Sequence, residues 1–225
     1  MAAGESFQRV ERSLGEVCAA CGRARSEVTL VAVSKTVGVP EVEQAIAAGA
    51  RDFGENRPDQ LMLKADALPD VRWHFIGNIQ SRRIRDIVGR AVLIHSLFEE
   101  SHAVKIDQIA AERGIVQDVL LEVNVSGEES KSGLEPAAVP AMLDACRGLS
   151  HVRVRGLMTM APIGEASVAR ATFEGLAQLR AQLAAGMDAE EVALFSELSM
   201  GMTDDWPEAV AAGATIVRIG RAIFA

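Results

Sequence analysis

Tyrosine is absent from the 225 residues, which excludes every mechanism that uses a phenol as acid or base. Lysine is scarce as well: of the 23 basic residues only four are lysines, at positions 35, 64, 105 and 131, and the rest are arginines. Because arginine keeps its proton in proteins, chemistry that needs a free amine must use one of these four lysines.

The chain also lacks excess positive charge and long apolar runs. Its formal charge of −8 at pH 7 argues against a protein that binds phosphate backbones or anionic membranes. No uncharged apolar run approaches the ~18 residues of a membrane helix, and Glu5 and Arg9 interrupt the region where a signal peptide is apolar. Three cysteines, an odd number, do not make a disulfide framework and fit a reducing compartment. We therefore expect a cytoplasmic protein with no nucleic-acid or membrane partner.

Short apolar runs alternate with helical patterns along the chain. An amphipathic stripe from Val10 to Cys21 predicts an N-terminal helix. Several of the runs that follow, such as LVAV and TIVRI, are continuously apolar, as strands covered on both faces are. The predicted strands span residues 30–33, 52–53, 72–76, 91–95, 119–125, 152–157, 194–198 and 215–219. The helices predicted between them span residues 39–48, 58–67, 80–88, 99–113, 135–147, 165–185 and 204–212.

Strict alternation of strands and helices leaves two main folds, an open doubly wound sheet or a closed (β/α)8 barrel. No G-x-G-x-x-G follows the first strand, so the dinucleotide-binding version of the open sheet loses its main support. The eight units and the chain length favour the barrel. The chain ends a few residues after the eighth strand, so we expect the N-terminal helix to cover the resulting gap. No repeat or linker interrupts residues 1–225, which we assign to one domain.

Lys35 ends the first predicted strand, and a barrel carries its site at the C-terminal ends of its strands. The side chain shares parity with Val31 and Val33 and is expected to point to the barrel mouth. One interpretation is a lysine whose ammonium group simply reaches water. The other is an amine that forms a Schiff base, with its pKa lowered by desolvation and neighbouring positive charge. The scarcity of lysine favours the second.

The segments Ser199-Met-Gly-Met and Arg218-Ile-Gly-Arg follow the seventh and eighth strands, where barrels often bind phosphate. Gly201 and Gly220 allow backbone N–H groups to approach an anion closely, and Ser199 offers a hydroxyl. Either glycine alone could simply turn the chain. Together with an amine on the first strand, the two segments indicate a phosphorylated carbonyl compound as ligand.

Other residues are weaker candidates for a functional site. Cys18-x-x-Cys21 has metal or redox spacing but lies late in a helix without partner ligands, and no metal triad emerges elsewhere, so no metal is expected. His74 and His95 end strands and are candidates to line the mouth. Lys131, in a polar glycine-bearing loop, is the second candidate amine.

Seven segments in order closely resemble the pyridoxal phosphate homeostasis proteins, also called the YggS or PROSC family. They are VAVSKT around Lys35, FGEN at 53–56, WHFIGNIQ at 73–80, VNVSGEESKSG at 123–133, GLMTM at 156–160, LSMGM at 198–202 and VRIGRAIF at 217–224. The resemblance implies a single (β/α)8 TIM barrel like the N-terminal domain of alanine racemase, with pyridoxal 5′-phosphate (PLP) held as a Schiff base on Lys35. It also implies that the protein binds, buffers and hands on PLP to apo PLP-dependent enzymes, with no established catalytic reaction.

The resemblance also implies a set of binding residues. The phosphate would lie on Ser199, Met200, Gly201 and Gly220. Arg218 would face the pyridine nitrogen, and Asn56 would lie near the ring. A cation beside that nitrogen disfavours its protonation and weakens the ring as an electron sink, which suits storage.

Two departures from the family pattern stand near these residues. Arg57-Pro58 follows GEN where the family usually has a tyrosine. Arg221 stands where the family usually has serine or threonine, and we expect its guanidinium to replace the hydroxyl with a charged contact to phosphate.

Three functions remain open on the sequence. The first is a monomeric PLP carrier without catalytic residues. The second is a PLP-dependent racemase-like enzyme, which the absent tyrosine, the expected lack of a second domain and the lack of an evident carboxylate beside the ring nitrogen disfavour. The third is a cofactor-free barrel aldolase whose lysine attacks a sugar phosphate directly.

Overall fold

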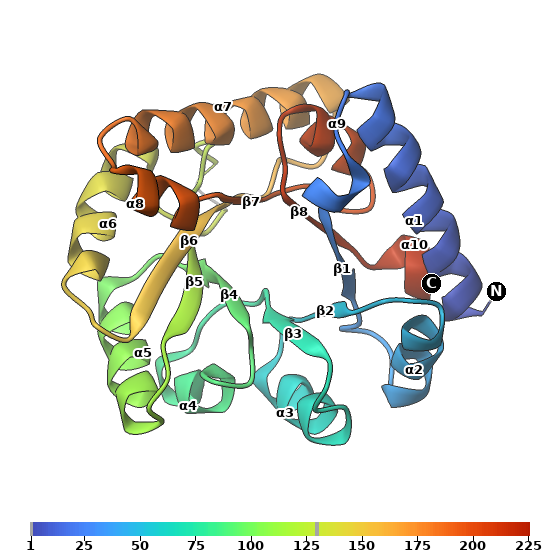
Figure 1. The fold of residues 1–225 in the computed structure, drawn as a ribbon, viewed down its shortest axis with the longest axis horizontal. Coiled ribbons are helices and arrows are strands. Elements are labelled where there is room, and N and C mark those ends of the chain that lie inside the picture. The colour runs from blue at the N-terminus through green and yellow to red at the C-terminus, as the bar shows by residue number, and fades with distance from the viewer. Residues whose placement is uncertain (1, 129–130) are drawn as a thin grey trace.

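A computed structural model describes residues 2–128 and 131–225. In it, eight parallel strands close into a barrel, each paired with the next and the last with the first (Figure 1). This confirms the (β/α)8 TIM-barrel prediction. The strands are β1 (Thr29–Val33), β2 (Asp52–Glu55), β3 (Arg72–Phe75), β4 (Leu93–Leu97), β5 (Gln117–Glu122), β6 (Val152–Met158), β7 (Glu197–Ser199) and β8 (Ile216–Ile219).

Helices form a ring outside the barrel (Figure 1). The α-helices are α1 (Ala3–Ala20), α2 (Val39–Ala47), α3 (Pro58–Ala67), α4 (Ile84–Ile87), α5 (Glu100–Glu112), α6 (Val139–Arg147), α7 (Ala166–Ala184), α8 (Ala189–Leu194), α9 (Trp206–Ala211) and α10 (Arg221–Phe224). Short 3-10 turns are η1 (Arg25–Glu27), η2 (Ser81–Arg83) and η3 (Pro136–Ala138).

The apolar strands separate two cores. The larger core fills the space between sheet and helices, and Ala32 and Phe53 belong to it. The smaller core lies inside the barrel and includes Val31, Leu120 and Ile216. Alternate residues of one strand therefore face different cores, which explains why runs such as TLVAV are apolar throughout.

Helix α1 lies beside α2, α9 and α10 and closes the ring (Figure 1). Helix α10, which follows β8, has only four residues. The apolar stripe of α1 supplies the missing cover, since Leu14 and Cys18 are fully buried. The expected role of the N-terminal helix is confirmed.

Several predicted bounds differ by two or three residues, and two predicted elements differ more clearly from the structure. Residues 189–194 form α8, so β7 begins at Glu197 instead of residue 194. The Asp188 carboxylate accepts hydrogen bonds from the backbone of Glu190 and Glu191 and begins this helix. The helix predicted over residues 80–88 is the turn η2 followed by the single turn α4.

No helix among the described residues is long and apolar enough to cross a membrane. Cys18, Cys21 and Cys146 are free thiols.

Candidate functional site

Four neighbouring strands bring most of the predicted site residues to one sector of the rim. Strands β7, β8, β1 and β2 are consecutive around the closed sheet. Near this rim the Arg218 N–H donates to Gly201 O at 2.9 Å, and the Ser34 N–H donates to Gly54 O at 3.0 Å. The residues that follow these four strands therefore share one side of the barrel mouth. They are Gly201 after β7, Gly220 after β8, Lys35 after β1 and Asn56 after β2.

Lys35 is exposed at this rim, two residues beyond the end of β1. Within the described residues its ammonium group makes neither a hydrogen bond nor an ion pair. Val31 and Val33, which precede it with the same parity, surround Gly54: a Cβ there would lie 3.0 Å from Val31 Cγ1 and 3.4 Å from Val33 Cγ2. The amine is therefore accessible and uncommitted.

A buried ion pair that the sequence reasoning missed lies directly behind Lys35. Lys64 Nζ is 2.5 Å from Glu55 Oε1 and donates to Ser34 O at 2.8 Å. The Ser34 hydroxyl donates to the same Glu55 oxygen at 2.6 Å. Ser34 immediately precedes Lys35, so the pair fixes the backbone that carries the amine. Two features of the sequence could have indicated this pair: Lys64 is one of only four lysines, and it lies on the helix that follows FGEN.

Gly201 occupies a place that no larger residue fits, and Gly220 one where a side chain would be tightly crowded. Gly201 has a φ of +90°, and a Cβ there would lie 2.6 Å from Ala209 Cβ. A Cβ at Gly220 would lie 3.1 Å from Val33 O. Within the described chain, the backbone N–H groups of both glycines donate no hydrogen bond. These two free donors are suited to an anion.

Met200 and Arg221 lie beside the glycines with their polar groups already engaged. The Met200 side chain is buried in the larger core, and its N–H donates to Ile216 O at 3.1 Å. The Arg221 guanidinium bonds the Asp204 carboxylate, and both side chains are about 70% exposed. Arg221 is thus at the rim and exposed enough to exchange this partner for another anion.

Ser199 and Arg218 point into the barrel. Arg218 Nη1 donates to Ser199 Oγ at 2.6 Å, and its Nη2 donates to Thr159 O at 3.1 Å. Burial lowers the pKa of Arg218 to about 10, so the guanidinium stays charged at neutral pH. The Ser199 hydroxyl, which was expected to contact phosphate, accepts a hydrogen bond from Arg218 in this structure.

His74 and His95 are buried inside the barrel, so the expectation that they line the mouth is wrong. His74 Nδ1 lies 2.9 Å from His95 Nε2, and His95 Nδ1 lies 2.8 Å from Ser199 Oγ. Desolvation by burial, and next the neighbouring His74 and Arg218, hold the pKa of His95 well below its ordinary value. His95 is therefore neutral.

Glu122, at the end of β5, is a second buried group that the sequence reasoning missed. Only 2% of the residue is exposed, and neither carboxylate oxygen has a hydrogen-bond partner among the described residues. Desolvation raises its pKa to about 7, against the opposing attraction of Arg218. An acidic residue that ends the apolar run VLLE was the available signal.

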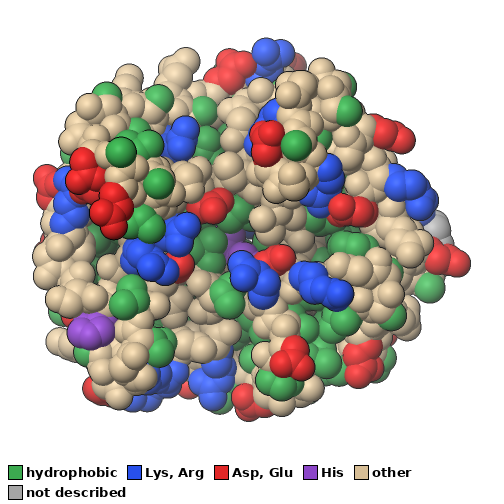
Figure 2. Space-filling model, viewed as in Figure 1, with side chains coloured by type: hydrophobic (Ala, Val, Ile, Leu, Met, Phe, Trp, Pro, Cys, Tyr) green, Lys and Arg blue, Asp and Glu red, His purple; other side chains and the backbone are tan. Residues whose placement is uncertain are grey.

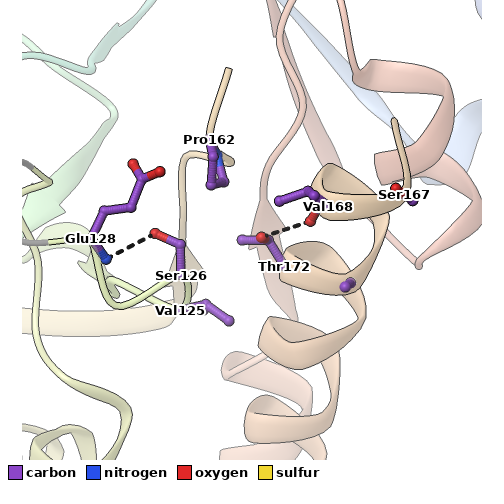
Figure 3. A pocket seen from close by; sticks show the side chains of 8 residues that line it. Val125, Ser126, Glu128, Pro162, Ser167, Val168 and Thr172 are labelled. Atoms are coloured by element: carbon purple, nitrogen blue, oxygen red, sulfur yellow. Dashed lines mark hydrogen bonds between the residues drawn. The ribbon is translucent and has the colours of Figure 1, made fainter. Parts of the chain in front are cut away.

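A cavity of about 510 Å³ lies elsewhere on the rim, between the segment after β5 and helix α7 (Figure 3). Two of its hydroxyl groups are engaged locally: Ser126 Oγ accepts from the Glu128 N–H, and Thr172 Oγ1 donates to Val168 O. None of the predicted site residues lines it. Its lining residues are Val125, Ser126, Glu128, Pro162, Ser167, Val168, Ala171 and Thr172.

Comparisons with known proteins agree with this barrel and rim. Residues 16–225 match the family described as "Alanine racemase, N-terminal domain". The "Pyridoxal phosphate homeostasis protein" of Aquifex aeolicus is 38% identical over 227 residues, which cover 100% of this chain and 98% of that protein. The chain belongs to the pyridoxal phosphate homeostasis family. The resemblance carried by the seven sequence segments is confirmed.

Solved structures similar to this family member share its fold. PipY of Synechococcus elongatus with PLP bound superposes with a TM-score of 0.81 at 35% identity, covering 94% of this chain and 100% of PipY. A protein of Bifidobacterium adolescentis described as unknown superposes with a TM-score of 0.93 at 35% identity, covering 99% of this chain and 94% of that one.

The Lys131 region of this family member is only partly described. Residues 129 and 130, within the segment VNVSGEESKSG, lie outside the described residues. Lys131 Nζ donates to Ala161 O at 3.5 Å. Its position after β5 places it away from the sector that holds Lys35.

Proposed function

We propose that this protein binds PLP through a Schiff base on Lys35, buffers it and delivers it to apo PLP-dependent enzymes, without robust catalysis. The observation that carries the proposal is an exposed amine just after β1, near two backbone N–H groups after β7 and β8, all three without a partner among the described residues. Relatives named for PLP homeostasis and a PLP-bound structure of PipY support it.

The residues present fit PLP. The backbone N–H groups of Gly201 and Gly220 would hold the phosphate, and Arg221 would add a charged contact. Met200, whose own N–H is bonded to Ile216 O, would hold the backbone beside Gly201 in place. Asn56, exposed after β2, would lie near the ring. When bound, PLP supplies an aldehyde that an amine can hold covalently and a ring that withdraws electrons.

Arg218 is the proposed neighbour of the pyridine nitrogen. A permanent guanidinium there disfavours a protonated ring, which suits retention of PLP more than carbanion chemistry. The lack of a carboxylate near this position no longer supports the proposal, because Glu122 shares the barrel interior with Arg218. Below pH 7 Glu122 is mainly neutral, and Arg218 is then the dominant charge.

The proposal also includes a cellular compartment and an oligomeric state. We place the function in the cytoplasm, where the free thiols of Cys18, Cys21 and Cys146 would stay reduced. Residues 1–225 act as one PLP-binding domain and as a monomer in this proposal.

A spectrophotometric titration with PLP tests the proposal. The native protein should develop the visible absorbance of a lysine-bound PLP, and Lys35→Ala should not. Lys131→Ala is the matched control, since it removes the second candidate amine, and it should bind as the native protein does. A native spectrum identical to that of free PLP, or an unchanged spectrum in Lys35→Ala, would contradict the proposal.

A further inference from the structure

Five side chains form a continuous hydrogen-bonded line through the interior of the barrel. It begins at Arg218 and Ser199, at the C-terminal end of the strands, with the 2.6 Å bond between them. It continues through His95 and His74 at 2.8 and 2.9 Å. It ends where His74 Nε2 lies 2.9 Å from the Oδ1 of Asp52, the first residue of β2. The line therefore joins the two ends of the barrel.

The direction of each hydrogen bond follows from the acceptor at the far end. His74 and Arg72 lower the pKa of Asp52 despite its desolvation, so Asp52 is a carboxylate and accepts the Nε2–H of His74. With that proton on Nε2, the Nδ1 of His74 is the acceptor, here of His95 Nε2–H. The neutral His95 in turn accepts from the Ser199 hydroxyl. Each of the four hydrogen bonds of the line then has one donor and one acceptor.

The opposite direction leaves a buried donor unsatisfied. If His74 carried a proton on Nδ1, His95 would donate to Ser199 through Nδ1–H. Ser199 already accepts from Arg218, and its own proton would have no partner among the described residues. An unsatisfied buried donor destabilises the fold, so the line should run from Arg218 to Asp52.

We propose that Asp52, His74 and His95, acting through Ser199, are positioning residues that hold Arg218 at the PLP site. The inference rests on the proposed function for its ligand, while the line itself is built from the chain's own residues. His95 anchors the Ser199 hydroxyl, which takes one arm of the guanidinium, and Thr159 O takes the other. The orientation of Arg218 toward the ring is thus set from the far end of the barrel.

The Asp52 end of the line lies close to water. Asp52 has a side chain 15% exposed, and Arg72, which donates to it at 2.8 Å, is 63% exposed. Figure 2 shows a hollow at the centre of the barrel in which a histidine side chain is visible between basic and acidic side chains. Substitutions at this end can therefore be made without touching the PLP site directly.

Histidine tautomers in the ligand-free protein give the first test. Nitrogen-15 NMR of imidazole groups distinguishes protons on Nδ1 from protons on Nε2. The expected result is Nε2–H at both His74 and His95 at neutral pH. Protonation of His95 on Nδ1 would reverse the line and overturn the proposal. This result does not depend on whether PLP binds.

Variants give the second test. His74→Gln and His95→Asn break the line, and His102→Gln is the matched control, because His102 is a buried histidine bonded to Ser81 outside the line. We expect PLP affinity to fall about tenfold in the first two, as for one lost hydrogen bond to a charged group, with a shifted absorbance maximum of bound PLP. His102→Gln should match the native protein in both.

The results of these two tests distinguish a failure of the proposed function from a failure of the positioning proposal. If the native protein binds no PLP, the proposed function fails and the tautomers still decide the line. If His74→Gln lowers the unfolding temperature but keeps native affinity and absorbance, its role is structural and the positioning proposal is wrong. Should that variant not fold, Asp52→Asn, which keeps an acceptor oxygen, replaces it and should show a smaller shift of the same sign.

Discussion

Arg218 and Glu122 are opposite charges buried in one barrel interior, and their partners differ. Arg218 has two hydrogen-bonded acceptors, whereas neither oxygen of Glu122 has a donor among the described residues. Desolvation therefore dominates at Glu122 and raises its pKa to about 7. A buried carboxylate in this state destabilises the fold when it ionises, which makes the effect measurable.

Glu122→Gln should change the pH dependence of stability. The folded pKa is raised above 4.5, so the unfolded chain loses its proton first and native stability falls as pH rises from about 4.5 to 7. Above pH 7 the ligand-free variant should be more stable than the native protein, by up to about 3 kcal/mol. Urea unfolding at pH 5 to 8.5 measures the difference, with the exposed Glu43→Gln as control. A difference independent of pH would refute the assignment.

Gly220→Ala tests the phosphate-binding glycine. Its Cβ would lie 3.1 Å from Val33 O, so the backbone has to adjust by a few tenths of an ångström, which should displace the Gly220 N–H from the anion. PLP affinity is expected to fall by about tenfold, the equivalent of ~1.4 kcal/mol. Gly15→Ala, where a Cβ meets nothing within 4 Å, is the control for the same chemical change. Equal affinities in the two variants would remove phosphate from this loop.

Arg221→Ser restores the residue type usual in the family. The pair with Asp204 is exposed, so the unfolding free energy should change by less than about 1 kcal/mol. PLP should remain bound, because a hydroxyl takes the place of the guanidinium. Equilibrium dialysis against PLP checks this, and loss of binding would show that the charge of Arg221 is indispensable.

At the scale of elements, the Lys64–Glu55 pair joins α3 to the ends of β1 and β2. Both side chains are almost wholly buried, at 1% and 0% exposed. Removing one partner leaves an uncompensated buried charge, whereas removing both can be nearly neutral. The pair therefore fixes the backbone next to Lys35 more than it adds to the net stability of the fold.

A double-mutant comparison measures this link. Lys64→Met alone should lower the unfolding free energy by about 3–5 kcal/mol, and Lys64→Met with Glu55→Leu should recover much of that loss. Denaturant unfolding of the single and double variants gives both values. If the double variant is as unstable as Lys64→Met alone, the ion pair is a net source of stability instead.

The bounds of helices and strands show where the local sequence pattern is enough to predict an element. The LVAV and TIVRI runs predicted β1 and β8 because both faces of these strands are covered. Helix α8 was missed because its apolar residues, Val192 and Leu194, read equally well as the start of a strand. The capping box from Asp188 to Glu191 distinguishes the two, but only once a helix is considered there.

At the scale of the whole molecule, the barrel and the sector holding Lys35, Gly201 and Gly220 were predictable. Order of elements determines which strand ends are neighbours in a closed parallel sheet. The interior was not predictable, because which polar side chains meet across a barrel depends on its stagger. Parity alone cannot show that His95 on β4 reaches Ser199 on β7.

The molecule as a whole should turn over amino acids slowly at most. The chain offers no tyrosine as a second base, and well-placed acids and bases each supply large factors in rate. Incubation of the PLP-loaded protein with L-alanine, followed by chiral chromatography, should show turnover below about 1 s⁻¹. Faster racemization would favour the racemase-like alternative.

The most direct measurement is the site of covalent attachment. Borohydride reduction of the PLP-loaded protein followed by peptide mass mapping should place one pyridoxyl group on the peptide that contains Lys35. The peptides with Lys64, Lys105 and Lys131 should remain unmodified. A pyridoxyl group on another lysine at the same stoichiometry, or none in a protein that retains PLP, would contradict the assignment of Lys35 as the PLP-binding residue.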